Sequence, residues 1–512
     1  MKRFFDGFID TIKRNEGVLY FLLILFIFAV AAVLRSQEWL SNNFLFLIDQ
    51  GRDMMAVKGI VFAHHLTLIG PYTSLQGVFQ GPLWYYLLAI PILITRGNPL
   101  GPQFLMFIIS MTTVLTVYLF TKLFFGKKVA AVSTFLFAIS PEAVAAATYI
   151  WNPHPMWLLI VLYIFTFYLV AIGKNKFQML LWLLVGLMFN FEAALAFFML
   201  LATFTYFLIF ERGKIRTRYF VFGMLLLLMT FSPQILFELR HNFLMTKSVL
   251  SLFSGHKQGL LIKGEQSGYS SLIVSHIQTF YNNFLSGFMQ FNLLPVLSQI
   301  FIVVFIGVGI FAAKLNVFSK NEKKYLSLLF WLAAIVFLLA FLYPFPIRYW
   351  FLTGFQTFYI LLIGFIVGKL WSNQWLKLII LIVFVLLCFQ TLQRINTIYS
   401  DTDLGGAAKI KGQEQAIDYI YQDAKGKPFG LFIFTPPVYT FQYDYLLWWY
   451  AGPKYHYLPY QEKKGTFYLL MQVDTDQPSS YKGWMETVIK TGKIIYTKTL
   501  EPSRFIVQKR QI

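Results

Sequence analysis

Three ionisable residues lie close together in the stretch LIDQGRDMMAVKGIV, residues 47–61. Asp49, Arg52 and Asp53 supply two carboxylates and a guanidinium within one helical turn or so of each other. The two acids are four positions apart, so on a helix they would share a face. A solvated helix start, favoured by the helix dipole, is the alternative interpretation. Asp49 follows the apolar segment FLFLI, and a partly dehydrated carboxylate there would suit general base catalysis.

The rest of the sequence is typical of a polytopic α-helical membrane protein. Of its 512 residues 57% are hydrophobic and only 13% are charged, which argues against a soluble protein. A helix needs about 20 apolar residues to cross a bilayer. About 11 transmembrane helices are predicted, at approximately 17–34, 102–125, 129–148, 156–173, 177–190, 193–210, 218–237, 294–313, 325–343, 349–368 and 375–392.

Lysine and arginine clusters between these runs predict cytoplasmic loops, because positive charge marks the cytoplasmic side. The amino terminus is then cytoplasmic, and the first outer loop spans 35–101. Two segments of this loop, 54–66 and 81–94, are predicted to be interfacial or re-entrant helices, and a twelfth or thirteenth crossing is left open. We interpret the formal net charge of +20 as the result of positively charged cytoplasmic loops and of attraction to anionic lipid or a phosphate-bearing substrate. No nucleic acid partner is predicted.

Residues 1–392 are thus predicted to form a transmembrane domain, and residues 393–512 an extracytoplasmic domain. In the second part the long apolar runs stop. GQEQAIDYIYQDAKGKP has helical spacing, whereas FGLFIFTP, TFYLLMQV and RFIVQK are typical of short strands. The sequence therefore predicts a small carboxyl-terminal α/β domain.

Further polar residues lie near the predicted outer face, where ionisable groups beside membrane spans are costly and therefore indicate function. They are Asn152, His154, Glu192, Arg240, His241 and Arg348. Because they come from distant stretches but share one membrane boundary, they would line a single outward-facing cavity. In the alternative interpretation His154 is a turn residue between two prolines, Glu192 is structural, and Arg348 is an interfacial anchor.

Other motifs point to packing rather than chemistry. Gly364 and Gly368 in GFIVG are typical of a helix-packing face. The sequence has no Walker motif, no paired-cysteine site and no His-x-x-x-His spacing in a plausible helix, so we predict no metal site. No cofactor is predicted, and a divalent metal requirement is left open.

The pattern resembles the C-type membrane glycosyltransferases, most closely the bacterial relatives of protein O-mannosyltransferase and of the lipid A aminoarabinose transferase. Asp49 and Arg52 match the acidic motif that opens the first outer loop of these enzymes, with Gln50 in place of their glutamate. GPLWYY, residues 81–86, matches their second motif with Gly81 in place of a proline, and residues 139–155 resemble the segment that brings the next outer loop to the site. The loss of the glutamate argues against a two-carboxylate or metal-assisted variant.

This resemblance implies a membrane-bound enzyme that takes a sugar from a polyprenyl phosphate and places it on an acceptor hydroxyl outside the cytoplasmic membrane. The acceptor is a lipid, a glycan or a protein. The chemistry calls for a base and a cation, for which we favour Asp49 and Arg348. Asp53 is the second choice of base or a positioner of Arg52.

The sugar or acceptor would contact Glu192, Asn152, His154 and Arg240 or His241. A single displacement would invert the anomeric configuration. A secondary transporter or lipid flippase, or a non-catalytic subunit of a surface polysaccharide assembly, is the alternative.

Overall fold

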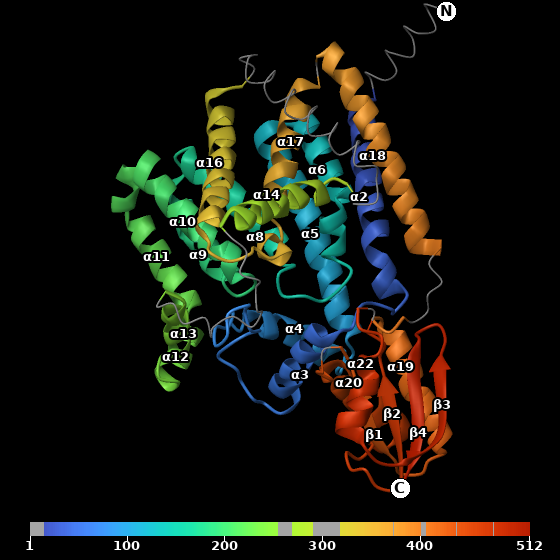
Figure 1. Ribbon diagram of the computed structural model, residues 1–512. Helices are drawn as coiled ribbons and strands as arrows, with labels where there is room; N and C mark the ends of the chain where they lie inside the picture. Colours follow the sequence, from blue (N-terminus) through green and yellow to red (C-terminus); the bar gives the residue numbers. More distant parts are fainter. Residues whose placement is uncertain are drawn as a thin grey trace, which may run out of the picture.

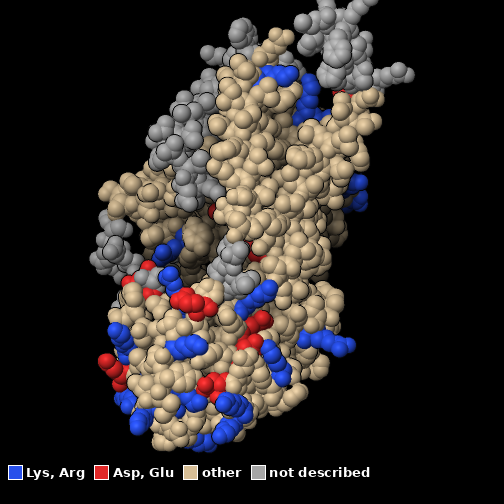
Figure 2. Space-filling view, turned by 90° about the vertical axis from the view of Figure 1, so that its right-hand side faces the viewer, with Lys and Arg blue, Asp and Glu red and all other residues tan. Residues whose placement is uncertain are grey.

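The computed structural model describes residues 15–253, 269–289, 318–371, 373–400, 406–436, 438–474 and 476–512. A bundle of helices forms one end of the molecule and a small sheet domain the other, with helices α3 and α4 between them (Figure 1). Figure 2 shows charged side chains gathered over the sheet-domain end, whereas the visible side of the bundle is largely uncharged. This distribution is the one expected of a bundle that lies in lipid.

Five helices in the described part of the chain are long and apolar enough to cross a membrane. They are α2 (Glu16–Leu40), α5 (Leu100–Phe125), α10 (Ala193–Phe210), α16 (Lys320–Leu342) and α18 (Gln374–Ser400). Helices α11 (Arg218–Thr230) and α12 (Ser232–Arg240) would make a sixth span, bent by 50°. Pro233 lies at this bend, where it cannot continue the backbone hydrogen bonds of α11.

The remaining helices outside the carboxyl-terminal domain are shorter or less apolar. They are α3 (Ile48–Phe62), α4 (Leu83–Ile94), α6 (Lys127–Ile139), α7 (Pro141–Ala145), α8 (Met156–Ala171), η1 (Asn175–Phe177), α9 (Gln178–Met188), η2 (Arg212–Arg216), α13 (Leu244–Phe253), α14 (Tyr269–Ser286), η4 (Tyr349–Leu352) and α17 (Gln356–Leu370).

The predicted count of eleven spans is not confirmed, although the mostly helical membrane architecture is. The predicted span 129–148 is divided into α6 and α7, because Pro141 cannot donate the next helical hydrogen bond. The buried Arg35 donates instead to the carbonyl oxygens of Phe137 and Ala138 at the end of α6. The predicted span 294–313 lies outside the described residues.

Close helix packing in the bundle follows the small residues of α17. A Cβ atom at Gly364 would overlap Ser133, and one at Gly368 would overlap Val129, both on α6. The two glycines therefore let α17 and α6 approach each other, and the predicted packing role of GFIVG is confirmed.

Helix α3 includes the three ionisable residues that the sequence placed before the predicted interfacial helix at 54–66. It begins earlier, at Ile48, because the side chain of Gln50 accepts a hydrogen bond from the backbone N–H of Leu47 (2.9 Å). The same side chain donates to the carbonyl oxygen of Ile150 (2.7 Å), which ties the start of α3 to the turn that precedes α8. Gln50 thus has a structural role at the position where the resembling family has an acid.

The carboxyl-terminal domain contains a four-stranded sheet in the order β1-β2-β4-β3. Strand β1 runs parallel to β2, and the other neighbours are antiparallel. Its elements are α19 (Ile410–Ala424), β1 (Gly430–Phe434), α20 (Phe441–Leu446), η5 (Leu447–Ala451), α21 (Gly452–Tyr455), β2 (Thr466–Met471), α22 (Ser480–Trp484), η6 (Met485–Ile489), β3 (Lys493–Leu500) and β4 (Phe505–Gln511). The α/β alternation matches the prediction, but β3 was not predicted. It is an exposed edge strand without the buried apolar pattern of the others.

This domain packs directly on the segment that leads into α3. The backbone N–H of Phe46 donates to the carbonyl oxygen of Ala408, and that of Ile410 donates to Phe44. Gln413 adds a side-chain hydrogen bond to the carbonyl oxygen of Phe46 (2.7 Å). The carboxyl-terminal domain therefore helps to set the position of α3.

Candidate active site

A cavity of about 600 Å³ opens where the start of α3 meets the helical bundle. Its wall comes from five other segments: the turn before α4, the turn before α8, the start of α10, helix α13 and the region around η4. The lining residues are Asp49, Arg52, Tyr72, Thr73, Ser74, Leu75, Val78, Gln80, Trp151, Asn152, Pro153, Glu192, Ala193, Ala194, Phe197, Phe198, Val249, Tyr343, Tyr349, Trp350 and Phe351. The fold thus brings residues from distant parts of the chain to one site.

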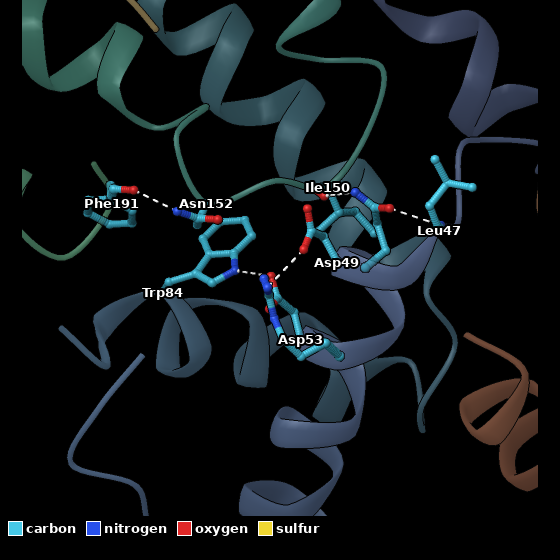
Figure 3. Close-up of polar contacts among 9 residues, drawn as sticks. Leu47, Asp49, Asp53, Trp84, Ile150, Asn152 and Phe191 are labelled. Carbon is cyan, nitrogen blue, oxygen red and sulfur yellow. Dashed lines mark hydrogen bonds and ion pairs between the residues drawn. The ribbon is translucent and has the colours of Figure 1, made fainter. Parts of the chain in front are cut away.

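Arg52 lies between the two acids of α3. Its guanidinium contacts Asp49 Oδ1 (2.8 Å) and Asp53 Oδ1 (2.8 Å). The indole N–H of Trp84 donates to the other oxygen of Asp53 (2.7 Å), as Figure 3 shows. Asp53 is fully buried and both its oxygens are engaged, whereas the side chain of Asp49 is 49% exposed and lines the cavity. Asp49 is therefore the carboxylate that a substrate can reach.

The electrostatics of this group favour a permanently charged Arg52. Burial by itself lowers the pKa of Arg52, but the carboxylates of Asp53 and Asp49 outweigh burial and raise it. Burial raises the pKa of Asp53, while Arg52 and the Trp84 indole act in the opposite direction. One face of the guanidinium also lies over the ring of Tyr72, at 5.3 Å from its centroid.

The turn WNPHP, residues 151–155, holds Asn152 and His154 in different environments. Asn152 lines the cavity and donates from Nδ2 to the carbonyl oxygen of Phe191 (2.7 Å; Figure 3). His154 is buried behind it, with Nδ1 at 3.0 Å from the carbonyl oxygen of Tyr149. Burial lowers the pKa of His154 to about 3, so the ring is neutral and donates from Nδ1. In this position His154 stabilises the turn and does not line the cavity.

Glu192 caps the start of α10. Its Oε1 accepts from the backbone N–H of Ala194 (3.2 Å), and the side chain lines the cavity. Burial raises the pKa of Glu192 to about 8, and the hydrogen bond from Ala194 only partly opposes this. No cation among the described residues forms an ion pair with Glu192, so it is largely protonated at neutral pH.

The remaining predicted site residues lie outside the lining. Arg348 directly precedes η4, whose residues Tyr349, Trp350 and Phe351 do line the cavity. Arg240 and His241 lie on the exposed end of α12, where the His241 ring stacks on Phe237. The structure therefore brings Asp49, Arg52, Asn152 and Glu192 together but leaves Arg240 and His241 apart.

Sequence reasoning missed several residues of the site, among them Trp84 and Gln80. Trp84 holds Asp53 in place, and Gln80 lines the cavity. Both lie in or next to GPLWYY, whose resemblance to a family motif was the available signal. Among the described residues no group of three or more His, Cys, Asp or Glu side chains is placed to hold a metal ion.

Residues 80–237 match the family model for dolichyl-phosphate-mannose-protein mannosyltransferase. No curated protein sequence matches the chain. The structure is similar to ArnT from Cupriavidus metallidurans bound to undecaprenyl phosphate, with a TM-score of 0.58 and 10% identity over 97% of this chain and 98% of that one. The apo state of the same protein gives a TM-score of 0.57, with the same identity and coverage.

An oligosaccharyltransferase from Archaeoglobus fulgidus in complex with Zn and sulfate also has a related structure. Its TM-score is 0.51 at 11% identity, over 94% of this chain and 72% of that one. At such low identity these structures establish the fold alone. Together with the family match, they confirm the predicted resemblance to the C-type polytopic membrane glycosyltransferases, and with it the prediction of a glycosyltransferase.

Proposed function

We propose that this C-type membrane glycosyltransferase transfers a sugar from a polyprenyl phosphate to an acceptor hydroxyl at the outer face of the cytoplasmic membrane. The observation that carries the proposal is the half-exposed carboxylate of Asp49, held by Arg52 at the wall of a cavity of about 600 Å³. The similar fold of ArnT, solved with undecaprenyl phosphate bound, supports a donor of this class.

Asp49 is the general base in this proposal. It takes the proton of the acceptor hydroxyl while the hydroxyl oxygen attacks the anomeric carbon of the sugar. The bond from that carbon to the phosphate oxygen breaks, and the polyprenyl phosphate leaves with the electron pair. One displacement on the face opposite the phosphate inverts the anomeric configuration.

Arg52 and Asp53 position the base. Because Asp49 Oδ1 is bound to Arg52 (2.8 Å), Oδ2 is the oxygen that takes the proton in this proposal. Asp53 binds Arg52 and is itself bound by the Trp84 indole, and neither Asp53 nor Trp84 lines the cavity. A base fixed in this way loses little entropy when the reaction begins.

Arg348 is the residue that we assign to the departing phosphate. Among the described residues that line the cavity, Arg52 is the only lysine or arginine, and its guanidinium is already paired with the carboxylates of Asp49 and Asp53. A further cation is therefore needed at the rim, and Arg348 directly precedes the η4 residues of the wall. A guanidinium can bind two phosphate oxygens at once.

The orientation in the membrane is part of the proposal. Helices α3 and α4 and the sheet domain lie at the same end of the bundle (Figure 1). Positive-inside reasoning places this end outside and the amino terminus in the cytoplasm. The cavity then faces the outer surface, where lipid-linked donors and their acceptors would meet.

The proposal is tested by transfer of radiolabelled sugar from polyprenyl phosphates in membranes that contain the wild type or Asp49→Asn at matched expression. We expect transfer by the wild type and loss of transfer in the variant, with donor binding retained. Proton NMR of the product's anomeric signal then checks inversion. Equal transfer by both proteins would contradict the base assignment, and no transfer from any donor would favour a transporter, a flippase or an assembly subunit.

A further inference from the structure

A second polar surface lines the same cavity, built by three turns that hydrogen bond to one another. The backbone N–H of Gly81 donates to the carbonyl oxygen of Phe189 (3.3 Å), and that of Leu83 donates to Asn190 Oδ1 (3.3 Å). Asn152 donates to Phe191. A Cβ atom at position 81 would overlap the Asn190 side chain, so glycine is required for this close approach.

Each turn contributes one polar side chain to the cavity lining. Gln80, Asn152 and Glu192 are 4%, 6% and 4% exposed, respectively. Gln80 Oε1 is buried without a hydrogen-bond partner among the described residues. Buried polar groups are almost always hydrogen bonded. An unpaired oxygen at a cavity wall therefore indicates that a ligand supplies the missing hydrogen-bond donor.

The hydrogen-bonding capacities of the three side chains complement one another. Asn152 uses its amide N–H₂ for Phe191 and presents Oδ1 as an acceptor. Gln80 Oε1 is a second acceptor, buried at the cavity wall without a partner among the described residues. Glu192 uses Oε1 for the N–H of Ala194, and a protonated carboxyl donates from its other oxygen. Two acceptors and one donor suit hydroxyl groups, which donate and accept at the same time.

The charges around Glu192 favour its neutral form. The titratable groups that line the same cavity are Asp49, Arg52, Tyr72, Tyr343 and Tyr349. Of these Arg52 is the one cation, and it is bound by Asp49 and Asp53. Burial raises the pKa of Glu192 to about 8. A sugar carboxylate would add another acid beside Asp49 and Glu192, and a sugar ammonium would require Glu192 to ionise in a dehydrated site.

Aromatic side chains complete the surface. Tyr72, Trp151 and Tyr349 line the cavity, and the rings of Trp151 and Tyr349 lie 6.3 Å apart. An aromatic face offers a large apolar surface to the C–H face of a sugar ring, while its edge hydroxyls reach polar groups. This combination of polar and aromatic side chains is typical of a site for a sugar ring and not of a site for a lipid tail.

We propose that Gln80, Asn152 and Glu192 bind the hydroxyl groups of the donor sugar and select an uncharged sugar over amino and uronic sugars. This inference rests on the proposed function for the identity of the ligand. It adds Gln80 as a specificity-determining residue, and it assigns Glu192 the role of hydrogen-bond donor rather than counter-ion.

The test measures donor binding separately from transfer. Detergent-purified protein is loaded with labelled polyprenyl phosphate, which is displaced by unlabelled polyprenyl phosphate or by polyprenyl phosphates with a neutral hexose, an amino sugar or a uronic acid. We expect the neutral-sugar donor to bind more tightly than bare polyprenyl phosphate, and Gln80→Leu to weaken its binding about tenfold. Gln356→Leu is the matched control, because Gln356 also has a buried Oε1 without a partner among the described residues but does not line the cavity.

Glu192→Gln supplies the second measurement, since glutamine keeps a donor but cannot titrate. In the wild type, neutral-sugar binding should weaken as pH rises through about 8 and Glu192 ionises; in Glu192→Gln it should not change there. Tighter binding of the amino sugar, lost in Glu192→Gln, would overturn the proposal. Equal binding of all four ligands would also overturn it. Selective binding without any transfer would support the sugar site and refute the proposed catalysis.

Discussion

Gly51 of α3 lies directly against Gln442 of α20, and a Cβ atom at position 51 would overlap the backbone N and Cα of Gln442. The contact joins the helix that carries Asp49 and Arg52 to the carboxyl-terminal domain. Gln413 strengthens the same junction through Phe46. We therefore expect this domain to position the catalytic helix.

Gly51→Ala should force α3 and α20 apart and lower kcat by about 10- to 100-fold, since small misplacements of catalytic groups are costly. Gly59→Ala is the matched control on the same helix, because a Cβ atom there meets nothing within 4 Å. Transfer rates of the two variants, with their melting temperatures, check the prediction. Equal rates would show that the junction does not position the base.

Asp49→Asn should lower activity, whereas Asp53→Asn should lower stability. Loss of the reachable base should lower kcat by about 10²- to 10⁴-fold and leave the melting temperature nearly unchanged, because Asp49 is half exposed. Asp53 is buried between Arg52 and Trp84, and breaking a buried pair destabilises a protein by about 3–5 kcal/mol. Kinetics and thermal unfolding of both variants separate the two roles, and a stable, inactive Asp53→Asn would make Asp53 the base.

Trp84→Phe removes the indole N–H that binds Asp53 Oδ2 and keeps most of the apolar surface. Hydrogen bonds to charged groups contribute about 1.5–3 kcal/mol, so the melting temperature should fall. The donor KM should change little, because Trp84 does not line the cavity. A large rise in donor KM with unchanged stability would contradict this role.

His154 should make the protein less stable as pH falls. Its pKa is lowered to about 3 in the folded state by burial, whereas an unfolded histidine has a pKa of about 6.5. The unfolded state then binds more protons, so stability is complete above about pH 6.5 and is lost progressively toward pH 3. Thermal unfolding between pH 7 and 4 should show a smaller decrease in His154→Gln than in the wild type, and parallel curves would refute this account.

Arg348→Ala should raise the donor KM by roughly 10- to 100-fold, the range expected for one strong phosphate contact. Arg240→Ala is the control, because Arg240 lies on the exposed end of α12 and outside the cavity lining. Donor titrations of both variants at constant ionic strength check the prediction. An equal effect of the two changes would show that Arg348 acts only through net charge.

Several features could be predicted from the sequence because they depend on neighbouring residues. Long apolar runs indicate a helical membrane protein whatever their packing, and the contact between Asp49 and Arg52 follows from their spacing on one helix. Strand β3 was missed because an exposed edge strand has no buried alternating pattern. The breaks at Pro141 and Pro233 were missed because the apolar runs continue through them.

The site itself depends on contacts between distant segments, which no local pattern records. Gln50 binds the turn at Ile150, and Trp84 encloses Asp53, which leaves Asp49 as the accessible acid. Hydrophobicity and residue spacing depend on neighbouring residues, so they can be read directly from the sequence. Burial and hydrogen bonding join residues that are far apart along the chain, so only the tertiary structure decided which acid faces the cavity and which polar groups face it with Asp49.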